Sequence, residues 1–62
     1  MRKVKQLKKW KIYENSEKEV KEYGFKYTVI HPDNDGCVGL TPADSDRECE
    51  TLDEAIDWIQ NY

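Results

Sequence analysis

The sequence predicts an α+β domain, in which a small antiparallel sheet of three or four strands carries one amphipathic C-terminal helix on one face. Residues 50–59 combine a helix-capping signal with apolar residues at helical spacing. Residues 25–31 are rich in aromatic and β-branched types, which are typical of a strand. The chain has 62 residues, of which 37% are hydrophobic, so residues 1–62 can form a single domain with one thin core.

The C-terminal helix has the clearest start signal. Thr51 and Glu54 form a capping box, in which the Thr51 hydroxyl accepts from the Glu54 N–H and Glu54 reaches back. Asp53 and Glu54 also lie where the helix dipole favours acids. At 100° per residue, one arc of this helix is apolar, and we expect it to face the sheet. The arc consists of Leu52, Ala55, Ile56, Trp58, Ile59 and Tyr62.

Residues 25–31 predict a strand that presents Phe25, Tyr27 and Val29 on one face, against the helix. Residues 32–36 are rich in turn formers, and their Asp-Gly end favours a positive φ.

After this turn, residues 37–40 predict a short returning strand. Pro42 ends that strand because proline interrupts a hydrogen-bonded ladder. Residues 46–50 form either a further edge strand or an extended approach to the helix.

The first half of the chain leaves alternatives open. Apolar and polar residues alternate around Trp10 and Ile12, which favours a strand from about residue 6 to 14, although the residues before it also suit a helix. Ser16 and Glu19 form a second capping box, and Gly24 suits a helix C-terminus. Residues 17–23 are therefore either a short helix or part of a long hairpin loop.

Charge divides the chain into two unlike halves. Residues 1–31 carry nine basic and four acidic side chains, whereas residues 32–62 carry one basic and nine acidic side chains. The halves have net charges of +5 and −8, which sum to the −3 of the whole chain.

Asp44, Asp46, Glu48 and Glu50 alternate in the acidic half, so an extended strand would place all four carboxylates on one face. Such a face either docks against a basic partner protein or balances the lysines of the first strand within the sheet.

An alternative binding surface lies in the first half. Trp10 and Tyr13 stand beside Lys9 and Lys11, and lysines next to aromatic rings suit phosphate contact and base stacking. The net negative charge opposes direct nucleic-acid binding, because the acidic half repels a phosphate backbone.

Few residues suggest catalysis or cofactor chemistry. His31 and Cys37 span a turn and could face each other as base and thiol, but no third orienting group is recognisable. Cys49 completes neither a C-x-x-C pair nor another zinc-ligand spacing, and two cysteines are too few for a disulfide scaffold. The residues around Asp33–Gly36 do not have the spacing of ligands that a calcium-binding loop requires. We therefore predict no enzyme, no metal and no cofactor.

The segment Glu50–Ile59, T-L-D-E-A-I-D-W-I after the glutamate, resembles the end of many small phage and bacterial β-meander proteins. The resemblance implies a mobile-element origin and a protein that inhibits a bacterial host factor, including a defence nuclease, by covering its surface. It implies no catalytic residue.

Two further expectations concern location and assembly. The sequence has no long apolar run and no apolar segment after its basic start, which favours the host cytoplasm over a membrane or export. Exposed aromatic residues on a thin core favour a homodimer.

Overall fold

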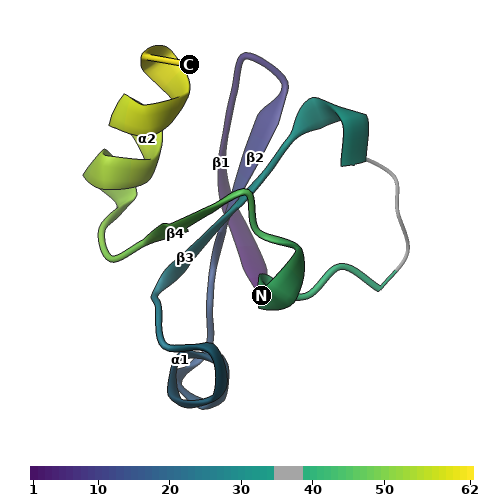
Figure 1. Ribbon diagram of the computed structural model, residues 1–62, viewed down its shortest axis with the longest axis vertical. Helices are drawn as coiled ribbons and strands as arrows, with labels where there is room; N and C mark the ends of the chain where they lie inside the picture. The colour runs from purple at the N-terminus through teal and green to yellow at the C-terminus, as the bar shows by residue number, and fades with distance from the viewer. Residues whose placement is uncertain (35–38) are drawn as a thin grey trace.

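The computed structural model describes residues 1–34 and 39–62. Four antiparallel strands form one open sheet with a C-terminal helix, which confirms the α+β prediction with four strands rather than three (Figure 1). The elements are β1 (Arg2–Leu7), β2 (Trp10–Glu14), α1 (Glu17–Tyr23), β3 (Tyr27–Ile30), the 3-10 turns η1 (Pro32–Asn34) and η2 (Pro42–Asp44), β4 (Arg47–Cys49) and α2 (Leu52–Gln60).

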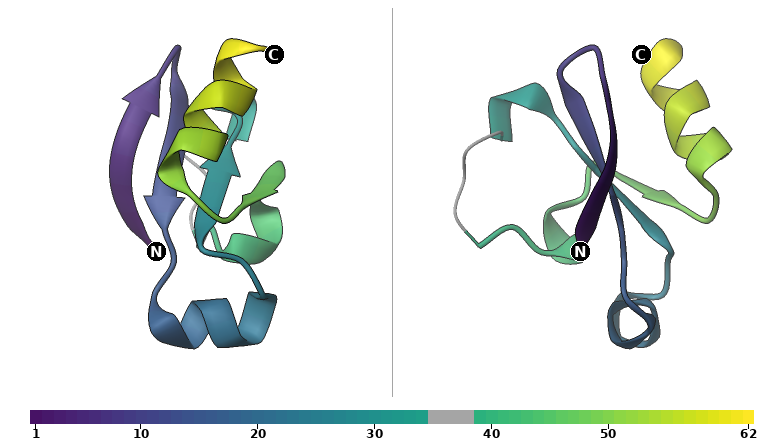
Figure 2. Two further views of the ribbon diagram at one scale, coloured as in Figure 1. Left: turned by 90° about the vertical axis from the view of Figure 1, so that its left-hand side faces the viewer. Right: turned by 180° about the vertical axis from the view of Figure 1, so that it is seen from behind.

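The strands lie in the sheet in their order along the chain, β1-β2-β3-β4, and every neighbouring pair is antiparallel. Helix α2 covers one face of the sheet over β2, β3 and β4, whereas β1 extends beyond it as an edge strand (Figure 2). Turns η1 and η2 lie on the opposite side of the sheet from α2 (Figure 1). Strands β1 and β4 are the two edges of this sheet, so its full width separates them.

The single strand expected over residues 6–14 is wrong, because the chain reverses at Lys8 and Lys9. These residues have φ values of 52° and 70°, and they join β1 to β2 in a two-residue hairpin. Positive φ at both central residues is the signature of a type I′ turn, whose twist matches that of paired strands. Lysine is not a residue that marks such a turn, so the sequence pattern concealed the first strand.

Helix α1 forms over Glu17–Tyr23, so the helix prediction is confirmed and the long-loop alternative is wrong. The Ser16 hydroxyl accepts from the Glu19 N–H at 3.2 Å, and the Glu19 carboxylate accepts from the Ser16 N–H at 2.8 Å. Gly24 ends the helix with φ 89°, in the left-handed region that glycine adopts without strain.

The second half holds one further correction. Residues 37–38 of the returning strand predicted over 37–40 lie outside the described residues, and Gly39 and Leu40 belong to no strand. The last strand is instead β4, which pairs with β3 through Tyr27↔Cys49, Thr28↔Glu48 and Val29↔Arg47. Residues 46–50 thus contain the edge strand that the sequence offered as one alternative.

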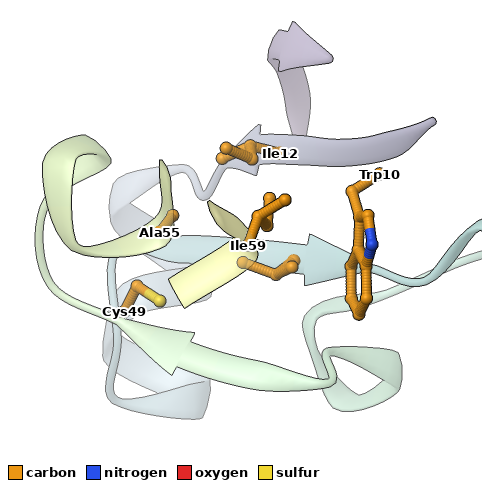
Figure 3. Packing of buried hydrophobic residues seen from close by; sticks show 6 residues of the cluster. Trp10, Ile12, Cys49, Ala55 and Ile59 are labelled. Atoms are coloured by element: carbon orange, nitrogen blue, oxygen red, sulfur yellow. The ribbon is translucent and has the colours of Figure 1, made fainter. Parts of the chain in front are cut away.

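The main core lies between α2 and the sheet. Its fully buried members are Trp10, Ile12, Val29, Cys49, Ala55 and Ile59. Cys49 and Ala55 lie at one end of this cluster and Trp10 at the other (Figure 3). Leu52 and Ile56 pack against it from α2 as partly buried residues, so the predicted apolar arc faces the sheet within α2. Tyr62, which was expected in the same arc, follows the helix and is 75% exposed.

Strand β3 is buried on both faces. Val29 faces α2, whereas Thr28 and Ile30 alternate to the other face, where they are 0% and 1% exposed. Phe25 precedes β3 and is buried, but it lies outside the main cluster, so its expected place on the helix-facing side is wrong. Turn η2 packs against β3 and covers part of this second face with the buried Pro42.

Candidate functional site

The strand order turns the charge division of the sequence into a division in space. Residues 1–9, which form β1 and the hairpin turn, carry five cations and no acid. Residues 44–57, from η2 to α2, carry seven acids and only Arg47 as a cation. Because β1 and β4 are opposite edges of the sheet, the molecule has a basic side and an acidic side.

Four carboxylates on the acidic side make no hydrogen bond or ion pair that holds the local structure of the described residues. They are the exposed side chains of Glu48, Glu50, Asp53 and Glu54, which we call the acidic edge. Within the described residues no hydrogen bond or ion pair engages any of these four side chains. Their full negative charge is therefore presented to solvent or to a partner.

The two remaining acids of the predicted face instead hold the chain that leads into β4. Asp46 accepts from the His31 N–H at 2.8 Å, and Asp44 accepts from the Thr41 N–H at 2.8 Å. Strand β4 spans only Arg47–Cys49, so the expected single strand with all four acids on one face does not form. Glu48 and Glu50 keep the exposure that a binding role needs, whereas Asp44 and Asp46 have loop-stabilising contacts.

The thiol of Cys49 lies beneath this acidic edge. Its side chain is fully buried and free of any disulfide. Burial raises the pKa of the Cys49 thiol, and the nearby Glu54 and Glu50 carboxylates raise it further against the smaller opposing effect of Arg47. The thiol therefore stays protonated, and a protonated buried thiol is a poor nucleophile. Cys37 lies outside the described residues, so the proposed His31–Cys37 pair cannot be placed.

An aromatic cluster closes the end of the sheet near the β1–β2 turn. Trp10 contacts three rings edge to face, with centroid distances of 4.7 Å to His31, 5.1 Å to Trp58 and 4.9 Å to Tyr62. Trp10 itself is only 5% exposed, so its indole belongs to the core and offers no free face for stacking. His31 accepts from the Asp33 N–H through Nδ1 at 2.9 Å.

Tyr13, the other aromatic residue of the alternative surface, is half-buried on β2. It pairs with Lys3 on one side and with Thr28 on the other. Side chains alternate between the two faces of β2, so Trp10 and Ile12 face α2 whereas Tyr13 faces away. The structure does not bring the two aromatic residues together as one surface.

A shallow depression of about 590 Å³ lies where α1 meets the sheet. Its floor includes Val20 and Tyr27, and its rim mixes two acids with two lysines. Glu14 on this rim is already paired with Arg2 at 2.8 Å, and the amide of Asn15 donates to the Phe25 carbonyl at 3.0 Å. The depression therefore has no clear charge preference for a ligand.

Across residues 1–34 and 39–62 no group of three or more metal-ligating side chains comes together, and no helix is long and apolar enough to cross a membrane. Comparison with known protein families, curated proteins and solved structures found no match.

Proposed function

We propose that this chain is a small protein-binding module that docks its acidic edge against a basic surface of a partner protein and catalyses no reaction. The observation that carries the proposal is the separation of charge across the sheet. Acids that merely balanced the lysines of β1 would lie beside them, but β4 and β1 are opposite edges. Complementary charge of this kind guides association and selects the partner.

The chemistry of the acidic edge supports binding rather than catalysis. A general acid or base is held beside the reacting atoms in a site that binds the substrate, whereas Glu48, Glu50, Asp53 and Glu54 are all exposed on the surface. The one described thiol nearby, Cys49, is buried and kept protonated. The same negative charge disfavours a phosphate backbone at this surface, which points to a protein partner.

The resemblance of residues 50–59 to small phage and bacterial proteins suggests the form of this binding. A protein from a mobile element would act in the host cytoplasm and inhibit a host factor by occluding its surface. A positively charged groove of a nucleic-acid enzyme, such as a defence nuclease, is a fitting target because it already attracts closely spaced negative charge.

Affinity capture from a bacterial lysate tests the proposal. The immobilised chain is compared with the double variant Glu48→Gln/Glu50→Gln, which removes two free charges and keeps the side-chain size. Glu17→Gln/Glu22→Gln on α1 is the matched control, because it removes the same charge from two other exposed positions. We expect a basic protein that the wild type and the control retain, and that the acidic-edge variant retains about tenfold less well.

Salt provides the second arm of the experiment. Binding to the acidic edge should weaken as ionic strength rises, because exposed charges are screened. Equal capture by the wild type and by Glu48→Gln/Glu50→Gln would overturn the proposed surface. Binding of single-stranded or duplex oligonucleotides by the isolated chain would favour the nucleic-acid alternative instead.

A further inference from the structure

Strand β1 presents an open edge with a charge opposite to that of the acidic edge. With six residues it is the longest of the four strands, and among the described residues β2 is the one strand that pairs with it. Backbone groups alternate between the two sides of a strand, so half of those in β1 point away from β2. Within the described residues these outward groups have no backbone partner. Such a row of free N–H and C=O groups is a template for one more strand.

The side chains of this edge determine which strand would fit. All of β1 except Leu7 is exposed, and Arg2, Lys3 and Lys5 supply its charge. The adjoining turn adds Lys8 and Lys9. Lys5, Lys8 and Lys9 take part in no hydrogen bond or ion pair within the part of the chain that the structure describes.

Lysines on an edge strand disfavour a second copy of the same edge, because like charges would lie opposite each other. They favour an incoming strand that carries acids. Val4 lies at a bulge between Lys3 and Lys5 and is 36% exposed, so it offers one apolar contact on this edge. Lys3 pairs with Tyr13 and Lys5 with Ile12, so the two lysines lie on opposite faces of the sheet. An incoming strand that carries acids on both of its faces, with a β-branched residue near Val4, complements these features.

We propose that the β1 edge binds an extended, acidic peptide segment of a partner protein by strand addition. The added strand pairs its backbone with β1 along Lys3–Leu7, and its carboxylates lie beside the lysines. This surface is distinct from the acidic edge, so the two could engage different regions of one partner or two partners at once.

The test uses a capped seven-residue peptide of glutamate with valine or threonine, in which glutamates stand at both odd and even positions and so on both faces of the strand. Two further versions carry backbone N-methyl groups, one at the odd and one at the even positions. A paired strand turns only one of its sides toward β1, so one methylated version should lose binding and the other should keep it. The amides of β1 should also become protected from hydrogen exchange when the unmodified peptide binds.

Protein variants supply the control for charge. Lys3→Glu/Lys5→Glu should weaken peptide binding by about tenfold or more, whereas Lys18→Glu/Lys21→Glu on α1 should change it by less than about twofold. Equal binding by both methylated peptides, or no protection of β1, would overturn strand addition. Protection of β1 without peptide that rises with protein concentration would show a second copy as the occupant. Tighter binding of a single-stranded oligonucleotide than of the peptide would equally reject the proposal.

Discussion

The hydroxyl of Thr28 donates a hydrogen bond of 2.7 Å to Oδ1 of Asn15, and both side chains are buried. The amide of Asn15 in turn donates to the carbonyl of Phe25 at 3.0 Å. This short chain of hydrogen bonds ties the end of β2 to β3 and to the segment that leaves α1. It lies on the face of β3 that α2 does not cover.

We therefore expect Thr28→Val to destabilise the fold although it conserves the shape of the side chain. The substitution leaves the buried Asn15 oxygen without its donor, which costs about 1–3 kcal/mol. Chemical denaturation monitored by tryptophan fluorescence measures the loss. Thr41→Val is the control, because the Thr41 hydroxyl is exposed and its bond to Asp44 is 3.3 Å long. An equal loss in both variants would contradict a special role for the buried pair.

The hairpin turn at Lys8 and Lys9 predicts a stabilising change. Non-glycine residues in the left-handed region cost roughly 1 kcal/mol or more each, and Asn-Gly is the preferred type I′ pair. Lys8→Asn/Lys9→Gly should therefore raise the free energy of unfolding by about 1 kcal/mol. In a domain of this size that corresponds to a melting temperature several degrees higher, roughly 4–8 °C.

Gly24→Ala provides the opposite case at the C-terminus of α1. Gly24 has φ 89°, and an added Cβ would meet no atom within 4 Å, so only backbone conformation opposes the alanine. We expect a loss of about 1 kcal/mol. A stabilised Gly24→Ala variant, or a destabilised turn variant, would show that positive φ does not control these two positions.

These two turns also show how far the sequence predicted the fold. Helix α2 and helix α1 were predictable because Thr51 and Ser16 begin them with side-chain caps that the structure contains. The return contact expected from the Glu54 side chain is wrong, because only the Thr51 half of that capping box forms. The β1–β2 hairpin was not predictable, since nothing in a Lys-Lys pair marks a positive φ. Pairing with β2 over residues 2–7 imposes that conformation, which is a tertiary effect.

The candidate site was predictable in its charge and less so in its geometry. The sequence identified Asp44, Asp46, Glu48 and Glu50 as one group, but alternation assumes a continuous strand. Turn η2 interrupts that strand, and backbone N–H groups of the loops then compete for Asp44 and Asp46. The lysines beside Trp10 in the sequence indicate a binding residue, whereas the contacts that Trp10 makes in the fold bury it.

The apolar face of α2 predicts a graded response to truncation. Ile59 is 1% exposed within the core, whereas Ile56 packs against the cluster from a partly exposed position. Ile59→Ala should cost about 2–5 kcal/mol, and Ile56→Ala should cost clearly less because less surface leaves water there. Thermal unfolding of both variants decides this order, and a larger loss at Ile56 would mean that the helix is rotated on the sheet.

Glu19 predicts a dependence of stability on pH. A hydrogen bond from the N-terminal ammonium at 2.8 Å, followed by the N–H of Ser16, lowers the pKa of Glu19 below its ordinary value of 4.5. A lowered folded-state pKa stabilises the fold above pH 4.5, and this contribution disappears as pH falls through the folded-state value. Glu19→Gln should thus be less stable than the wild type at pH 7, with the difference shrinking in acid.

The control for this titration is Glu22→Gln on the same helix, since the Glu22 side chain is exposed and has no hydrogen bond or ion pair among the described residues. Its difference from the wild type should stay nearly constant with pH. Urea denaturation at several pH values between 3 and 7 measures both variants. A Glu19→Gln difference that is independent of pH would assign the stabilisation to packing rather than to the charged contact.

The two kinds of acid in residues 44–50 predict two separable effects. The Asp46 carboxylate accepts from the His31 N–H, so Asp46→Ala should lower the free energy of unfolding by about 1 kcal/mol. Glu48→Gln/Glu50→Gln removes no hydrogen bond and should leave stability within about 0.5 kcal/mol of the wild type. The two variants should have the opposite effects on affinity for the captured partner. Glu48→Gln/Glu50→Gln should lose affinity, whereas folded Asp46→Ala should keep it. Measuring the melting temperature and the partner affinity of both variants separates structural from docking charge. If Asp46→Ala lost affinity while Glu48→Gln/Glu50→Gln kept it, the docking surface would lie toward η2 and His31 rather than at the acidic edge.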